Sequence, residues 1–149
     1  MKKLNLILLV SLLFTGCGLF ELSEVNNNNN NEIVVDDTLE SNIINSLKDA
    51  TREDCITAYT FFSGMSLYIE KSSKLTTTDQ VQDLFIKVED DYKWDREKYP
   101  KLTDVIATDM INRGFKTPRE INQETKKLLI SAFNEYGEAC LKAAKEKNQ

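Results

Sequence analysis

Apolar and polar positions divide this chain into three stretches. Residues 4–14 form a short, mostly apolar run directly after Lys2 and Lys3. A polar tract follows, centred on six consecutive asparagines at 26–31. From Thr38 onward, apolar residues recur at steps of three and four, which is the spacing of one face of an α-helix. The pattern therefore predicts a helical domain behind a tract that has no apolar surface to bury and is expected to be disordered.

Five helices are predicted in this domain, at about 39–47, 51–71, 77–92, 99–114 and 117–147. Only three glycines and two prolines lie beyond residue 37, and so few turn formers favour helices with few connections. We expect an all-α fold, a small four-helix bundle with the short leading helix packed across it. Its core would include Cys55, Ala58, Phe62, Met65, Val81, Phe85, Val88, Leu102, Ile106, Leu129, Phe133, Tyr136 and Cys140.

Local signals mark where these helices begin. Thr51–Asp54 places a capping hydroxyl before acidic residues in a first turn. Thr77 with Gln80 three residues later fits the capping box, and Pro100 suits the first position of a helix. These three signals predict three separate helix starts.

The strongest start signal precedes the last helix. Thr117–Glu120 combines an N-cap hydroxyl, a proline at the first helical position and a capping-box glutamate. Just before it, Gly114 is a natural stop for the preceding helix. We therefore expect the last helix to begin at Thr117.

The N-terminal run has the form of an export signal. It is too short to span a bilayer, which takes about 20 residues, and it ends on small residues before a cysteine. Phe14–Cys17 resembles the lipobox of bacterial lipoproteins, although Phe14 stands where leucine is usual. The resemblance implies cleavage after Gly16, acylation of Cys17 and insertion of its acyl chains into the bilayer. The alternative is an ordinary secretory signal with a chance cysteine.

The resulting organisation has three parts: a signal peptide at 1–16, a tether at 17–37 that carries the lipidated Cys17, and a helical domain at 38–149. Gly18 follows the cysteine, where an aspartate is associated with retention in the inner membrane of enteric bacteria. The expected location is thus the bacterial cell envelope, at the outer membrane facing the periplasm if the cell is Gram-negative.

The charge and composition of the chain limit the classes of partner that it is expected to bind. Cleavage before Cys17 removes Lys2 and Lys3, which takes the formal net charge from −5 to −7. Nucleic-acid binding needs a basic face, so we expect no nucleic-acid partner.

Two cysteines remain once Cys17 carries lipid, Cys55 and Cys140. In an oxidising compartment the simplest expectation is a structural disulfide between them. Two separate buried thiols are the alternative.

The sequence offers little catalytic chemistry. It contains no histidine, no glycine-rich phosphate loop and no pattern of metal ligands, so we expect no cofactor and no metal site. The acidic residues Glu89, Asp90, Asp91, Asp95 and Glu97 are the remaining candidates for acid–base work on a glycan such as peptidoglycan. Runs of acids are usually solvated surface, so we favour a non-enzymatic protein.

The best candidate for binding a partner is the segment at 92–100. Tyr92, Trp94, Arg96 and Tyr99 are of the residue types that dominate interfaces, and Trp94 is the only tryptophan. Alternatively, the large aromatic residues fold back and close the end of the bundle. Gly64 marks either a notch for a partner or a close contact between helices.

Two resemblances bear on function. The Tyr59-x4-Gly64 pattern and the Tyr99–Leu102 stretch are similar to a group of exported immunity proteins that neutralise toxins, although the cysteine spacing differs. Lipoproteins of this size from phages and plasmids block superinfection or repeat conjugation. We therefore expect a lipid-anchored protein that binds or blocks an envelope, phage or toxin protein.

Two alternatives stay open beside this expectation. One is the envelope hydrolase that works through acidic residues. The other is a carrier of a lipid or small ligand in an apolar cavity between helices. The core aromatic residues Phe61, Phe62, Phe85 and Phe133 look sufficient to fill such a cavity.

Overall fold

The computed structural model of this chain describes residues 38–115 and 120–147, and this part is an all-α helical bundle. The predicted signal peptide at 1–16 and the tether at 17–37, with Cys17, lie outside the described residues. Within the described ranges no helix is both long and apolar enough to cross a membrane.

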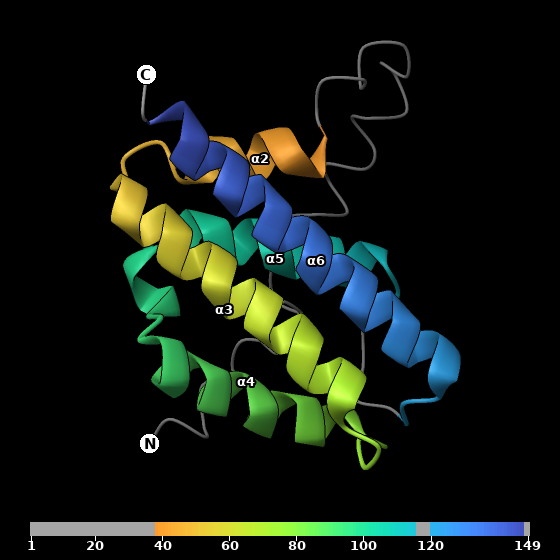
Figure 1. Cartoon of the computed structure of the whole chain (residues 1–149). Helices are drawn as coiled ribbons and strands as arrows, with labels where there is room; N and C mark the ends of the chain where they lie inside the picture. The colour runs from red at the N-terminus through yellow and green to blue at the C-terminus, as the bar shows by residue number, and fades with distance from the viewer. Residues whose placement is uncertain (1–37, 116–119, 148–149) are drawn as a thin grey trace, which may run out of the picture.

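Helices α3 (Arg52–Lys71) and α6 (Gln123–Glu146) form the centre of the bundle and run antiparallel (Figure 1). At one end of the pair the Lys126 ammonium donates a hydrogen bond to the Ser72 carbonyl, at 2.7 Å. At the other end the Lys147 ammonium donates to the carbonyl of Lys48, at 3.1 Å. Hydrogen bonds therefore connect the two segments at both ends of the pair.

The remaining helices cover this central pair from different sides. Helix α4 (Thr78–Tyr92) packs against α3, whereas α2 (Leu39–Ser46) crosses α6 and also contacts α5 (Pro100–Asn112). Figure 1 shows α2 and α4 at opposite edges of the view, with α5 behind the pair. The predicted short leading helix and the all-α fold class are confirmed.

Most of the predicted helix ends are confirmed by their hydrogen bonds. The Thr51 hydroxyl accepts from the Asp54 amide, and the Asp54 carboxylate accepts from the Thr51 amide. The Gln80 side chain accepts from the amide of Thr77 at 3.2 Å. Pro100 is the first residue of α5, and Gly114, with φ of 101°, ends it. Local sequence signals therefore set these boundaries.

The predicted start of the last helix at Thr117 is wrong. Glu120 forms an isolated antiparallel bridge with Thr77, and the Ile121 amide donates to the Thr76 carbonyl at 2.7 Å. Helix α6 begins only at Gln123, where the side chain of Asn122 caps it. Long-range pairing with the segment before α4 has outweighed the local signal. Residues 117–119 of that signal lie outside the described ranges.

The predicted disulfide between Cys55 and Cys140 is absent, and the alternative of two buried thiols describes the structure. Both side chains are fully enclosed by the core. Burial raises the pKa of each thiol, most of all that of Cys140. Cysteine count and compartment predicted a bond, but they do not fix the relative geometry of the two sulfur atoms.

A partly buried polar cluster joins α5 to α6. The Tyr136 hydroxyl donates to the Asp109 carboxylate, which also accepts from the Arg113 guanidinium at 2.6 Å. Arg113 pairs in turn with Glu135. Burial, with the hydrogen bond to Asp109, raises the pKa of the Tyr136 phenol. The cluster fixes the position of α5 on the central pair.

Candidate binding site between α4 and η2

The four residues predicted to bind a partner all lie where the chain passes from α4 to α5 through the short 3-10 helix η2 (Arg96–Lys98). The turn out of α4 is made by Lys93, whose φ of 58° is a left-handed conformation. It is stabilised by the Trp94 amide, which donates to the Glu89 carbonyl at 3.0 Å. Trp94, the residue that follows this turn, is buried.

Trp94 is part of the core. Its indole lies between the rings of Tyr99 and Phe61, with centroid distances of 5.4 and 5.9 Å. Only 7% of Trp94 is exposed. This placement corresponds to the packing alternative for the residue, because an indole so deeply enclosed has little surface to offer a partner.

Tyr92 lies across α3 at Gly64. A Cβ atom added to Gly64 would be 2.5 Å from Cε2 of Tyr92, so the ring occupies the space that the glycine leaves. The notch at Gly64 is therefore a close helix contact filled by the protein itself. Tyr92 is still 37% exposed, which makes it the only one of the four predicted residues with a large exposed ring.

Arg96 is held by two residues of α4. Its guanidinium pairs with the Glu89 carboxylate at 3.0 Å and lies over the ring of Phe85, with its central carbon 5.2 Å from the ring centroid. The side chains of Arg96 and Glu89 are 11% and 12% exposed. The Nη1 atom of Arg96 is buried and has no hydrogen-bond acceptor among the described residues. A cationic donor is thus positioned without a partner on one of its nitrogens.

Glu89 is unusual among the carboxylates of the site. Burial raises its pKa to about 7, although the neighbouring Arg96 opposes the shift. Nearby Asp95 and Asp90 raise it further. Burial thus makes Glu89 easier to protonate than an exposed carboxylate, while the ion pair with Arg96 favours its charged form.

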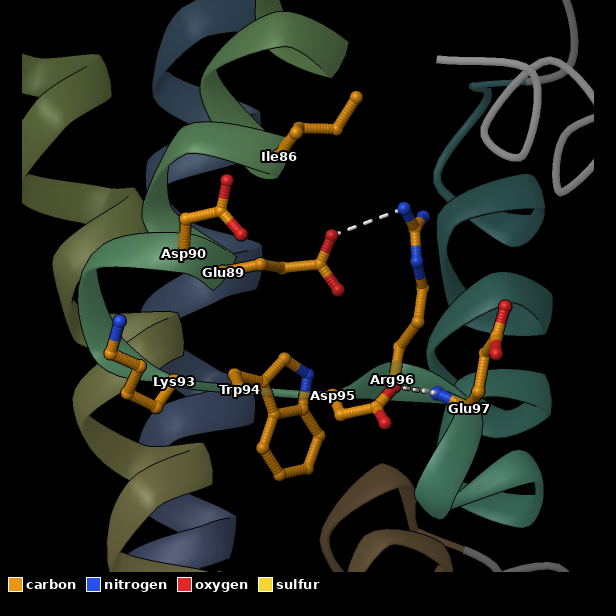
Figure 2. A pocket seen from close by; sticks show the side chains of 8 residues that line it. All are labelled: Ile86, Glu89, Asp90, Lys93, Trp94, Asp95, Arg96 and Glu97. Carbon is orange, nitrogen blue, oxygen red and sulfur yellow. Dashed lines mark hydrogen bonds and ion pairs between the residues drawn. The ribbon is translucent and has the colours of Figure 1, made fainter. Parts of the chain in front are cut away.

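A hollow of about 550 Å³ opens at this ion pair (Figure 2). In Figure 2, Glu89 and Arg96 reach toward each other across it, and the indole of Trp94 lies beside them. The Asp95 side chain shapes one wall by accepting a hydrogen bond from the Glu97 amide at 3.0 Å. The hollow is lined by Ile86, Glu89, Asp90, Lys93, Trp94, Asp95, Arg96 and Glu97. It is a charged, open surface site.

The acidic residues predicted as hydrolase candidates are only partly brought together. Glu89, Asp90, Asp95 and Glu97 line the hollow, whereas Asp91 lies away from it and accepts a hydrogen bond from the Tyr68 hydroxyl at 3.4 Å. In the described ranges, no group of three or more histidine, cysteine, aspartate or glutamate residues is placed to hold a metal ion.

Sequence reasoning missed Ile86 and Lys93 as members of the site, and it missed the pairing of Glu89 with Arg96. One signal was available: Glu89 follows Phe85 by four residues, so it lies beside the inner stripe of α4 and not on its polar face. No protein-family model, no curated protein and no solved structure matches this chain.

Proposed function

We propose that this chain is a non-enzymatic, lipid-anchored protein of the bacterial cell envelope that binds or blocks a partner protein through the hollow between α4 and η2. The observation that carries the proposal is the position of the Arg96 guanidinium at this hollow. It is fixed by Glu89 and Phe85, yet one buried nitrogen has no acceptor among the described residues. The ordered pair of Arg96 and Glu89 borders an open, charged hollow of about 550 Å³, which gives a side chain of a partner room to enter.

The mechanism needs three parts of the chain. Acyl chains on Cys17 hold the protein at the bilayer, and more than one chain is needed for stable anchoring. A flexible tether at 18–37 would span roughly 25 Å on average, since flexible chains extend by about 5–6 Å times the square root of their length. Anchoring raises the local concentration at the membrane, so a moderate affinity of the helical domain suffices.

The partner class is an envelope, phage or toxin protein, and the protein acts as an immunity or exclusion factor or as an accessory envelope factor. The Gly18 residue after the lipidated cysteine favours the outer membrane, facing the periplasm, in a Gram-negative cell. Nothing in the hollow favours nucleic acid, because acids outnumber bases among its lining residues.

The test is a crosslinked pull-down from intact envelopes, quantified by mass spectrometry. Wild type is compared with Cys17→Ser, which cannot be acylated, and with Arg96→Gln. Arg52→Gln is the matched control, because it removes an exposed guanidinium at the start of α3. The proposal expects one enriched partner with wild type and Arg52→Gln, and loss of that partner with the other two variants. Equal capture by all four forms, or no enriched partner at all, overturns it.

One observation favours a second candidate, the envelope hydrolase. A carboxyl group with a pKa of about 7 in a hollow with other carboxylates has the property of a general acid. Glu89 would then protonate the leaving oxygen of a glycan. Purified protein that degrades peptidoglycan, with activity lost in Glu89→Gln, would establish this candidate in place of the first.

The carrier alternative has no comparable support. The four core aromatic residues contact one another by their rings and thus occupy the space between helices where an apolar ligand would lie. Those residues are Phe61, Phe62, Phe85 and Phe133.

A further inference from the structure

We infer that residues 89–99 form a clasp: the contact of Glu89 with Arg96 closes it over the ring of Phe85, and it opens while the rest of the bundle stays folded. The clasp consists of the end of α4, the turn at Lys93 and η2. The inference concerns the hollow of the proposed function and describes its conformational control. Its test uses the purified protein alone, so the two can fail independently.

The contact that closes the clasp is costly in free energy. The side chains of Glu89 and Arg96 are largely shielded from solvent, and removing two charges from water can cost more than their attraction returns. Arg96 adds a second cost, because its buried Nη1 donor has no acceptor among the described residues. A contact between apolar side chains at this place would carry neither cost.

The turn that leads to this contact is also strained. Lys93 has φ of 58° and ψ of 34°, a left-handed conformation that is unfavourable for residues with a Cβ atom. The Trp94 amide, which donates to the Glu89 carbonyl at 3.0 Å, holds the turn in place. Non-glycine residues in this conformation persist where their surroundings enforce it, and they gather in clamps and switch regions. The costs of the ion pair, the donor and the turn therefore coincide within residues 89–96.

Little buried surface holds α4 against this strain. Only Val81 and Val88 of α4 are buried, whereas eight residues of α3 and ten of α6 are. Segments with few buried contacts open at a lower free energy than the core does. On the side of η2, by contrast, Trp94 stacks on Phe61 and Tyr99. We therefore expect the end of α4 and η2 to separate at the contact of Glu89 with Arg96.

Opening changes the surface of the hollow. The central carbon of the Arg96 guanidinium lies 5.2 Å from the centroid of the Phe85 ring and covers it. When Arg96 leaves, this ring borders the hollow of about 550 Å³, which Ile86 and Trp94 already line. The closed clasp thus keeps an aromatic surface of the site covered.

Hydrogen exchange of the full chain in detergent, resolved by residue with NMR, tests the inference. The reporter is the Trp94 amide, whose hydrogen bond to the Glu89 carbonyl must break when the clasp opens. The reference amides lie in the middle of α3 and α6. We expect the Trp94 amide to exchange at least about a hundredfold faster than these references. Low concentrations of urea should leave its rate unchanged, because a local opening exposes little surface.

Two variants remove the costs and should keep the clasp closed. Lys93→Gly allows the left-handed turn without strain, and we expect it to slow exchange at Trp94 about fivefold. Glu89→Leu with Arg96→Met replaces the ion pair and the unpaired donor by apolar side chains, and we expect it to slow this exchange about tenfold.

Glu40→Leu with Lys142→Met is the matched control. It replaces an exposed ion pair between α2 and α6 in the same way, far along the chain from the clasp, and should leave exchange at Trp94 unchanged. Circular dichroism verifies that each variant keeps its helices.

The outcomes decide for or against the clasp. Slower exchange at Trp94 in both closing variants, with the wild-type rate in the control, supports it. Exchange at Trp94 only together with the reference amides overturns it, and so does exchange at the wild-type rate or faster in either closing variant. Failure to capture a partner in the pull-down affects the proposed function alone.

Discussion

The indole of Trp94 lies almost parallel to the ring of Tyr99, with 10° between the planes and 5.4 Å between the centroids. The ring of Phe61 also stacks on the indole, with 5.9 Å between the centroids. The residue type that most often anchors an interface therefore closes the end of the core at the turn after α4. The hollow that we propose as the binding site is lined in part by this residue, of which only 7% is exposed.

Replacement of Trp94 by alanine is consequently expected to destabilise the fold. Loss of a buried tryptophan costs about 3–5 kcal/mol, because the contacts are lost and a cavity remains. Trp94→Phe keeps part of the stack and is expected to cost less. Urea unfolding followed by circular dichroism measures the free energy of unfolding. Unchanged stability in Trp94→Ala would mean that the indole is not part of the core.

Local signals in the sequence predicted the fold better than they predicted the site. The capping groups at Thr51 and Gln80 act within a few residues, so sequence alone located those helix starts. The residues before α6 are drawn into a pairing of Glu120 with Thr77, which no local pattern encodes, and the helix starts only after the Asn122 cap. The missed start at Thr117 is therefore a failure of local reasoning against a long-range contact.

The site was harder to predict for a similar reason. The left-handed turn at Lys93 is made by a residue without the usual glycine signal, and the buried Trp94 follows it directly. It also brings Arg96 back to Glu89, seven residues earlier in the chain. Residue types singled out this segment, but they do not fix the direction in which each side chain points, which depends on the backbone conformation between α4 and η2.

The hydrogen bond from Tyr136 to Asp109 is expected to be worth more than an ordinary one. The Tyr136 side chain is fully buried and its acceptor is a carboxylate that also binds Arg113. Tyr136→Phe should lower the free energy of unfolding by about 1.5–3 kcal/mol, as for hydrogen bonds to charged groups. Tyr59→Phe is the control, since no hydrogen bond of the Tyr59 hydroxyl occurs within the described part of the chain. Equal losses in the two variants would contradict the role of the cluster.

Substitution by alanine at two helical glycines should have different effects on the free energy of unfolding. A Cβ at Gly137 would lie 3.0 Å from the Ser63 side chain and 3.6 Å from its backbone nitrogen, inside the α3–α6 contact. At Gly64 the clash is with the outer ring atoms of Tyr92, which is partly exposed. We expect Gly137→Ala to cost about 1–3 kcal/mol by overpacking, and Gly64→Ala to cost less because the tyrosine ring can swing away.

A double-mutant cycle tests this explanation. In a Tyr92→Ala background the clash at Gly64 is gone, so Gly64→Ala should become stabilising by about 0.5–1 kcal/mol through helix propensity. Thermal unfolding of the wild type, the two single variants and the double variant gives the coupling free energy between positions 64 and 92. Additive effects would mean that Tyr92 does not fill the space at Gly64.

Thiol titration tests the state of the two core cysteines. Because Cys55 and Cys140 are buried and the pKa of each is raised, neither should react with a thiol reagent at neutral pH in the folded protein. Both should react once the chain is unfolded in denaturant without a reductant. Protein isolated from the envelope that shows no reactive thiol when unfolded, with Cys17 acylated, would instead carry a disulfide.

The raised pKa of Glu89 predicts an unusual dependence of stability on pH. Its folded-state pKa of about 7 lies above the usual value of 4.5, so between these values the folded state binds more protons than the unfolded state. The contribution of Glu89 to the free energy of unfolding is fully present below about pH 4.5 and is lost as the pH rises through 7. The charged groups that act on it are Arg96, which favours its ionised form, and Asp95 and Asp90, which oppose it.

The expected loss from this group is about 2–4 kcal/mol between pH 5 and pH 8, since a tenfold difference in proton affinity between the two states corresponds to about 1.4 kcal/mol. Urea unfolding at several pH values measures the slope of the free energy of unfolding against pH. Glu89→Gln cannot titrate and should remove most of the slope, although it also leaves Arg96 without its ion pair and lowers stability at all pH values. Asp54, whose pKa is lowered, acts below about pH 4 and does not interfere. A wild-type stability that rises from pH 5 to pH 8, with the same slope in Glu89→Gln, would show that Glu89 is an ordinary charged carboxylate.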